Sequence, residues 1–305
     1  MTTMVALVGE QPIPNLLPVR YLKPEALVLV YTKLSEPVAR RLQKLCAATE
    51  VYPLEIRDAY RVAEIRNRIQ QVVADRTDLI FNLTGGTKTM VLAAYELARQ
   101  SRSPFLYFQT EGPRGRDQQS ILYRYAWDSD EAELDQRIII SQPLITLDDY
   151  LRAHFDDYTK TGFSRESGGI LERAVHDALK DYVDEIEAGV WPSGMKDQVE
   201  IDLAVRCGNQ VGFIEVKWGG GKSGKRAIDQ LTTAAARELS GIYAARFLVT
   251  GVTRDDQYKA VATALNITII ELPEWQWKRR ALSPNDAARL RQAIAQRLPC
   301  RKAAV

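Results

Sequence analysis

Four charged residues at alternate positions of two strand-like runs have the types needed for metal-dependent chemistry. They are Glu200 and Asp202 in QVEIDLAVRC, and Glu215 and Lys217 in VGFIEVK. The Gly-Asn dipeptide at 208–209, between the two runs, favours a two-residue hairpin turn. In that register Asp202 lies opposite Glu215 and Glu200 opposite Lys217, and strand alternation places all four side chains on one face.

This clustering of carboxylates predicts a divalent metal site. A solvent-exposed hairpin with paired charges would explain Glu200 opposite Lys217, but it does not explain Asp202 opposite Glu215, because directly opposed like charges destabilise a hairpin. Carboxylate oxygens are the ligands that suit Mg²⁺ or Mn²⁺. Such an ion lowers the pKa of a bound water and stabilises charge on a phosphodiester in the transition state.

The surrounding residues resemble the motif of the PD-(D/E)xK nuclease fold, with an acid in the helix GGILERAVHDAL, a strand carrying EID and a strand carrying IEVK. The resemblance implies a set of catalytic residues: Glu172, Glu200, Asp202, Glu215 and Lys217. It also implies that Asp202, Glu215 and the carbonyl of Val216 bind the metal. For Glu172, and for Gln230 at a position where the family often has glutamine, a surface position is an equal alternative. The nearby cluster Lys222, Lys225 and Arg226 fits a rim for a nucleic-acid backbone, or an ordinary loop.

A second group of residues, in FNLTGGTKTM (81–90), has the types needed to bind a phosphate. Gly85 and Gly86 permit a tight backbone turn, and a helix starting near Thr87 offers unpaired N–H groups. Thr84 adds a hydroxyl and Lys88 a positive charge. The spacing excludes both a P-loop and the dinucleotide fingerprint GxGxxG. A glycine turn capped by threonine, without a ligand, is the alternative.

The elements that must position these residues can be inferred from hydrophobic periodicity. In the first half, five short apolar runs alternate with helical patterns: MVALV, ALVLVY, VYPLEI, DLIFNL and PFLYF. This pattern is typical of a parallel, doubly wound sheet. Polar segments follow the first, second and fourth runs, at the edge where open α/β sheets bind ligands.

The TGGTK segment after the fourth strand resembles the signature of CARF domains, the CRISPR-associated Rossmann-fold sensors of cyclic oligoadenylates. GEQPIPN, after the first strand, resembles the second ligand loop of the CARF subgroup that is fused to nucleases. The resemblance implies that cyclic tetra-adenylate binds across the twofold axis of a homodimer. The residues implied to contact it are Gln11, Asn15, Thr32, Asn82, Thr84, Gly85, Gly86, Thr87 and Lys88.

The predicted fold class is α/β: a Rossmann-like CARF domain (1–145), a linker (146–164), a PD-(D/E)xK restriction-endonuclease-like domain (165–275) and a basic C-terminal region (276–305). The predicted function is that of a metal-dependent endonuclease of type III CRISPR antiviral defence, activated by cyclic tetra-adenylate and cleaving DNA, RNA or both. The HEPN ribonuclease is disfavoured because neither His154 nor His176 follows an arginine at the required spacing. The alternative is a non-catalytic, ligand-sensing regulator that binds DNA.

Composition limits the remaining choices. The 305 residues have a net charge of only +2, but 276–305 is rich in Lys and Arg, which fits either a solvated helix or a nucleic-acid contact. No apolar run is long enough to span a bilayer, and the first run is interpreted as a strand of a cytoplasmic protein without membrane contact. The cysteines Cys46, Cys207 and Cys300 are widely spaced, which predicts three reduced thiols and no zinc site.

Overall fold

The computed structural model describes residues 1–46, 49–112, 117–164, 168–193, 200–218, 241 and 243–300, except for the side chain of Trp277. The chain divides into two compact units, Met1–Glu111 with Gln119–Ile145, and Gly112–Gln118 with Thr146–Val305. Among the described helices none is long and apolar enough to cross a membrane. Gln230 and the basic residues at 222, 225 and 226 lie outside the described residues.

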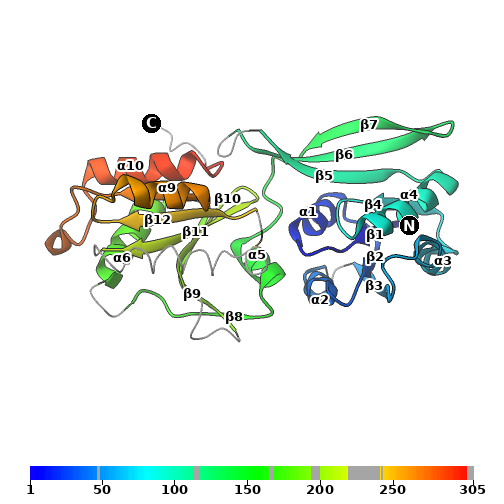
Figure 1. Ribbon diagram of the computed structural model, residues 1–305, viewed down its shortest axis with the longest axis horizontal. Helices are drawn as coiled ribbons and strands as arrows, with labels where there is room; N and C mark the ends of the chain where they lie inside the picture. Colours follow the sequence, from blue (N-terminus) through cyan, green and yellow to red (C-terminus); the bar gives the residue numbers. More distant parts are fainter. Residues whose placement is uncertain are drawn as a thin grey trace. The chain divides into compact units, whose positions relative to one another are not determined.

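The first unit is a seven-stranded sheet in the order β3-β2-β1-β4-β5-β6-β7. Its strands are β1 (Thr2–Leu7), β2 (Ala26–Tyr31), β3 (Glu50–Glu55), β4 (Asp78–Asn82), β5 (Phe105–Glu111), β6 (Gln119–Asp128) and β7 (Glu131–Ile139). Its helices are α1 (Ile13–Leu22), α2 (Glu36–Leu45), α3 (Val62–Val73) and α4 (Lys88–Gln100). Helices α1 and α2 cover one face of the sheet, and α3 and α4 cover the other (Figure 1).

The five predicted strands are all present, and they pair in parallel. Strands β1 and β2 are almost continuously apolar because helices bury them on both faces. The sheet is mixed, however, since β6 and β7 form an antiparallel hairpin that extends it beyond β5. Ile138 and Ile139 form the end of β7. This hairpin escaped prediction because the burial pattern of β7 is mostly exposed.

The second unit is a six-stranded sheet in the order β13-β12-β11-β10-β9-β8. Its strands are β8 (Tyr158–Lys160), β9 (Glu185–Pro192), β10 (Ile201–Cys207), β11 (Gln210–Lys217), β12 (Ala245–Thr250) and β13 (Ile267–Glu271). Its helices are α5 (Leu147–His154), α6 (Gly168–Leu179), α9 (Asp256–Ala264) and α10 (Pro284–Ala295), with a 3₁₀ turn η1 (Trp277–Arg279). Strands β11, β12 and β13 are parallel to one another, and the other pairs are antiparallel.

The segment 146–164, expected to be a linker, contributes α5 and β8 to the second unit. Thr146 and Asp149 form a reciprocal capping box at the start of α5. Tyr150 is buried on this helix, and its ring lies 6.4 Å from that of Phe213 on β11. These contacts make α5 part of the unit's core.

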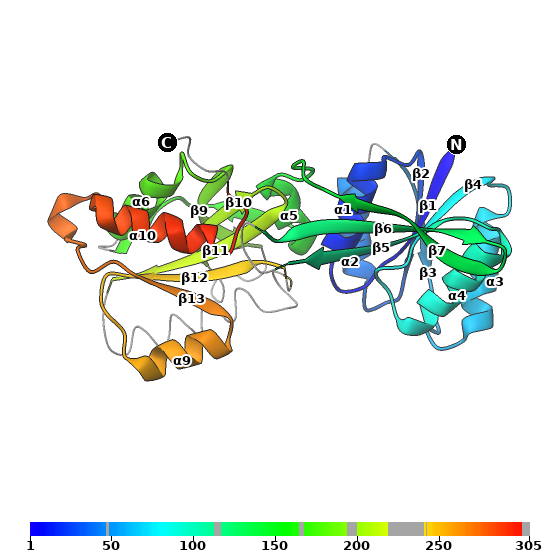
Figure 2. The same ribbon diagram turned by 90° about the horizontal axis from the view of Figure 1, so that it is seen from above.

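The segment 276–305, expected to be a basic C-terminal region, contains a core helix. Leu290 and Ile294 of α10, with Leu298 after it, are fully buried in the main core cluster of the second unit. In Figure 2, α10 lies on one face of the sheet and α9 on the other. The basic residues of α10 therefore lie on the outer side of a packed helix.

The prediction of three reduced thiols is wrong in this structure. Cys207, at the end of β10, forms a disulfide with Cys300, after α10, whereas Cys46 is free and buried. The two bonded cysteines are 93 residues apart in sequence but their Cα atoms are 4.8 Å apart. Spacing along the chain could not reveal this proximity, because it arises from the packing of α10 against the sheet.

Candidate catalytic and ligand-binding sites

The hairpin that carries the candidate catalytic residues has the predicted register. Strands β10 and β11 pair from Leu203 opposite Ile214 to Cys207 opposite Gln210, so the turn falls at Gly208 and Asn209. Residues on one face of the hairpin belong to the core cluster: Leu203, Val205, Ile214 and Val216. Strand alternation puts Asp202 and Glu215 on the opposite face.

Three of the candidate side chains are in direct contact. Nζ of Lys217 lies 2.6 Å from Oε1 of Glu215 and 3.8 Å from Oδ2 of Asp202. The backbone N–H of Val216 donates a hydrogen bond of 2.7 Å to the same Asp202 oxygen. Both carboxylates are buried, at 6% and 3% exposure. The ammonium group of Lys217 therefore contacts both of the opposed carboxyl groups.

Burial dominates the electrostatics of this group. Desolvation raises the pKa of Asp202 to about 6, against the opposing effects of Lys217 and the Val216 N–H. Desolvation, followed by the charge of Asp202, raises the pKa of Glu215 to about 8. Burial lowers the pKa of Lys217, but the two carboxylates outweigh it and raise that pKa overall. Perturbed groups of this kind are typical of functional sites.

Glu172 and Glu200 also belong to this cluster. Glu172 is buried on α6, and its Oε2 accepts a hydrogen bond of 2.9 Å from the N–H of Ser164. Burial raises the pKa of Glu172, although the Ser164 bond lowers it, and burial together with the charge of Glu172 raises the pKa of Glu200. The fold thus gathers all the predicted catalytic residues. The contact of Ser164 with Glu172 was not predicted, because any residue type except proline can donate a hydrogen bond from its backbone N–H.

The donor set fits a hard divalent cation only in part. Among the described residues, no three His, Cys, Asp or Glu side chains form a group that could hold a metal ion. Asp202, Glu215 and the carbonyl of Val216 nevertheless offer oxygen ligands, which Mg²⁺ and Mn²⁺ prefer. Oε1 of Glu215 is buried, and the Lys217 ammonium lies 2.6 Å from it. A cation would fit if Lys217 withdrew from between the carboxylates.

The candidate ligand loops of the first unit lie at adjacent strand ends. Strand β1 pairs with β2 on one side and with β4 on the other, so the segments after these strands share one edge of the sheet. A Cβ atom on Gly85 would lie 2.2 Å from the carbonyl oxygen of Leu7, and Gly86 has a φ of +75°. Only glycine therefore allows the β4–α4 turn to approach the end of β1 this closely.

Thr87 and Lys88 begin α4 at the surface. Thr87 is the N-cap, and its hydroxyl accepts a hydrogen bond from the N–H of Met90. Both residues are exposed, so Lys88 presents its charge to solvent at the N-terminus of α4. This is the local arrangement that binds a phosphate. Gln11 and Thr32 are half-buried beside the neighbouring strand ends.

Asn82, by contrast, is fully buried, and its side chain forms hydrogen bonds to other residues of these loops. Its amide nitrogen donates bonds of 2.9 Å to the carbonyl of Pro14 and to Oδ1 of Asn15, and its own oxygen accepts one of 2.6 Å from the Thr84 hydroxyl. Thr84 in turn accepts from the N–H of Phe108. The amide of Asn15 donates to Leu7. These three side chains thus tie the segments after β1 and β4 to each other and to β5.

Comparison with known proteins supports the interpretation of the first unit. Residues 3–150 match the family model of the Card1 CARF domain. The chain therefore contains a CARF domain, within an α/β fold of mixed sheets. No curated protein sequence matches the chain.

Solved structures show the same fold over both units. Can2 from Sulfobacillus thermosulfidooxidans, in complex with cyclic tetra-adenylate, covers 97% of this chain and 99% of its own, with a TM-score of 0.72 at 15% identity. Protein VC1899 from Vibrio cholerae covers 98% and 99%, with a TM-score of 0.73 at 14% identity. A type III CRISPR defence DNA nuclease activated by cyclic oligoadenylate covers 98% and 52%, with a TM-score of 0.65 at 15% identity.

Proposed function

We propose that this protein is a metal-dependent nuclease of type III CRISPR defence that is switched on by cyclic tetra-adenylate. The observation that carries the proposal is the buried Asp202–Glu215–Lys217 cluster in a chain whose other half contains a CARF domain. Two proteins of similar fold support it, one solved with cyclic tetra-adenylate and one described as a DNA nuclease activated by cyclic oligoadenylate.

In the sensing half, the phosphates of the cyclic ligand bind at the start of α4. The exposed Lys88 and Thr87, with the first N–H groups of the helix, supply charge and donors. Gly85 and Gly86 let the turn pack against the end of β1 and offer their backbone groups to the ligand, and Gln11 reaches it from the segment after β1. Asn15, Asn82 and Thr84 hold the two loops in register without touching the ligand. A homodimer supplies two such half-sites to one symmetric ring.

In the catalytic half, the second unit forms a PD-(D/E)xK domain in which Asp202, Glu215 and the Val216 carbonyl hold Mg²⁺ or Mn²⁺. When bound, this ion would supply an activated water and would stabilise charge on the phosphodiester. The Val216 N–H fixes Asp202 by its Oδ2, and this leaves Oδ1 available as a ligand. Lys217, released from Glu215, turns its ammonium toward the phosphate and the incoming water. Glu172 and Glu200 keep the site anionic.

The raised pKa values of the two carboxylates give the site a defined pH response. Burial and the charge of Asp202 raise the pKa of Glu215, so this carboxyl holds its proton to a higher pH than an exposed one, and the proton must leave before the group can bind a cation. Metal affinity should therefore rise with pH across the range in which this carboxyl ionises. Calorimetric titration of Mn²⁺ in buffers of different ionisation enthalpy would count the released protons.

Cleavage assays test the proposal directly. Labelled single-stranded DNA, single-stranded RNA and supercoiled plasmid would be incubated with Mn²⁺ or Mg²⁺ and cyclic tetra-adenylate. We expect at least one substrate to be cut by the wild type and by the surface variant Asp181→Asn, and none by Lys217→Ala. Ligand binding without cleavage of any substrate would instead favour a non-catalytic regulator that binds DNA.

A further inference from the structure

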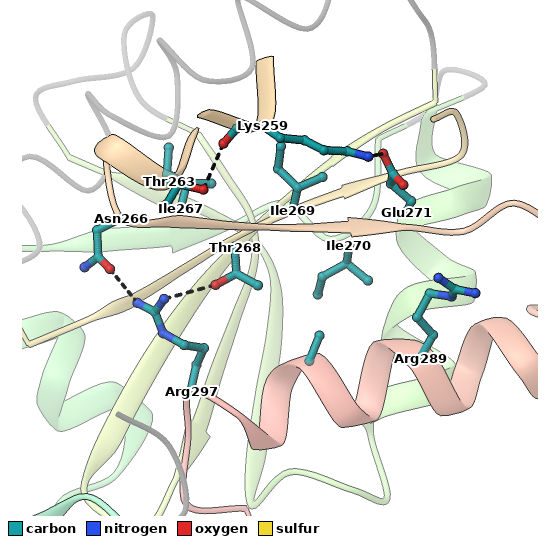
Figure 3. Close-up of a pocket in the computed structure, with 11 residues that line it drawn as sticks. Lys259, Thr263, Asn266, Ile267, Thr268, Ile269, Ile270, Glu271, Arg289 and Arg297 are labelled. Carbon is teal, nitrogen blue, oxygen red and sulfur yellow. Dashed lines mark hydrogen bonds and ion pairs between the residues drawn. The ribbon is translucent and has the colours of Figure 1, made fainter. Parts of the chain in front are cut away.

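The second unit has a pocket away from the carboxylate cluster, along the outer edge of its sheet. Strand β13 is the last strand of this sheet, and the pocket follows it between α9 and α10, with a volume of about 510 Å³. Figure 3 shows the lining side chains on both sides of β13. No predicted site residue lines this pocket.

The charges around the pocket favour an anionic ligand. Three cationic side chains line the pocket: Lys259 on α9, Arg289 on α10 and Arg297 after α10. The single carboxylate among the lining residues is that of Glu271. Arg289 is exposed on α10, and Arg297 lies eight residues further on. Arg297 therefore follows the end of α10, in the turn after the helix. The pocket lining thus carries more positive than negative charge.

The polar groups are held in place before any ligand arrives. The guanidinium of Arg297 donates to the hydroxyl of Thr268 at 3.1 Å and to Oδ1 of Asn266 at 3.0 Å. Nζ of Lys259 lies 3.0 Å from Glu271 (Figure 3). Isoleucine side chains of β13 provide apolar walls beside these groups. Fixed cations beside an apolar wall suit a sugar and its phosphate.

The position of the pocket relates it to the catalytic cluster. Lys217 is in register with Thr250 on β12, and Thr250 is in register with Glu271 on β13. Since neighbouring strands are about 4.8 Å apart, the backbones at Lys217 and Glu271 are about 10 Å apart. One strand of B-form DNA advances about 3.4 Å per nucleotide, so about three nucleotides span this distance.

We propose that this pocket binds the sugar-phosphate backbone of the substrate strand, about three nucleotides from the cleavage site. The inference rests on the proposed function, which makes nucleic acid the substrate. The pocket volume is that of a small-ligand site, so it admits one extended strand and not a double helix. Arg289 and Lys259 pair with phosphates, and Arg297 shapes the wall.

Equilibrium binding in EDTA tests this inference without cleavage. Fluorescence anisotropy of a labelled single-stranded oligonucleotide on the full chain would be measured at several salt concentrations. For single strands, each lost phosphate contact lowers the log–log salt slope by about 0.7. We expect Arg289→Ala combined with Lys259→Ala to lower it by about 1.4 and to weaken binding about tenfold or more at low salt. Arg289→Lys, which keeps the charge, should retain the slope.

Arg291→Ala is the matched control, because Arg291 is exposed on the same helix but donates to the carbonyl of Ala178 and does not line the pocket. An unchanged slope in the double variant, or an equal loss in Arg291→Ala, would overturn the inference. So would self-association of the wild type that Arg289→Ala abolishes without any change in slope, since the edge of β13 would then join two copies. If the protein cuts no substrate but shows the predicted salt slopes, the proposed nuclease activity is wrong, whereas the proposed binding of a nucleic-acid strand in the pocket is supported.

Discussion

Neutralising Glu215 should stabilise the metal-free protein at high pH and leave it unchanged at low pH. Burial and Asp202 raise the pKa of Glu215 from 4.5 to about 8. A carboxyl group with a raised pKa contributes stability that is fully present below its unfolded pKa and is lost as pH rises through its folded value. A difference of one in pKa between the folded and unfolded states is worth about 1.4 kcal/mol, so the loss between pH 4.5 and pH 9 is on the order of 4 kcal/mol.

Glu215→Gln keeps the shape of the side chain and removes the ionisation. In EDTA, its Tm should match that of the wild type near pH 5, where Glu215 is protonated in the folded state. At pH 9 it should exceed the wild type by about 10 °C, since one kcal/mol shifts Tm by about 2–4 °C for a unit of this size. Tryptophan fluorescence reports the transition, because Trp191, Trp218 and Trp275 lie in the second unit.

Asp181→Asn, at an exposed position of the same unit, controls for the general effect of removing a negative charge. Excess Mn²⁺ should raise the Tm of the wild type at pH 8 and should have little effect on Glu215→Gln. Parallel Tm curves for wild type and Glu215→Gln from pH 5 to pH 9 would refute the claim that burial holds the proton on this carboxyl.

Three further predictions concern the loops and the disulfide. Gly85→Ala should destabilise the first unit by about 1–3 kcal/mol in thermal unfolding, because its Cβ would lie 2.2 Å from the carbonyl oxygen of Leu7; an unchanged Tm contradicts this. Lys88→Ala should weaken binding of cyclic tetra-adenylate about tenfold or more by calorimetry at unchanged Tm, because the ammonium is exposed; equal affinity would remove its role. Cys300→Ser should destabilise the second unit by about 4 kcal/mol, since the disulfide closes 93 residues, and dithiothreitol should lower the wild-type Tm similarly; insensitivity of both would argue against the bond.

The parts of the fold that could be predicted are those encoded locally. The alternation around the Gly-Asn turn was sufficient to give the register of β10 and β11, and hence the juxtaposition of Asp202 and Glu215. The five parallel strands were equally predictable, because burial on both faces leaves continuous apolar runs. These features could be predicted because they depend on residues that are close together in the sequence.

What could not be predicted depends on contacts between distant segments. The sequence predicted Asn82 as a ligand contact, but it could not show that its amide donates to the carbonyl of Pro14 and to the side chain of Asn15, which are far away along the chain. The Cys207–Cys300 bond likewise depends on where α10 packs. In the catalytic cluster, the sequence indicated which carboxylates oppose each other, but not that Lys217 would lie between Glu215 and Asp202.

The central claim is that ligand binding in one unit switches on cleavage by the other. The most direct measurement is the initial rate of nucleic-acid cleavage in Mn²⁺ as cyclic tetra-adenylate is titrated, for wild type, Lys88→Ala and Lys217→Ala. The account predicts a saturable activation in the wild type, the same activation shifted to higher ligand concentration in Lys88→Ala, and no cleavage at any concentration in Lys217→Ala. Cleavage by the wild type that is independent of the ligand, or that survives in Lys217→Ala, would contradict it.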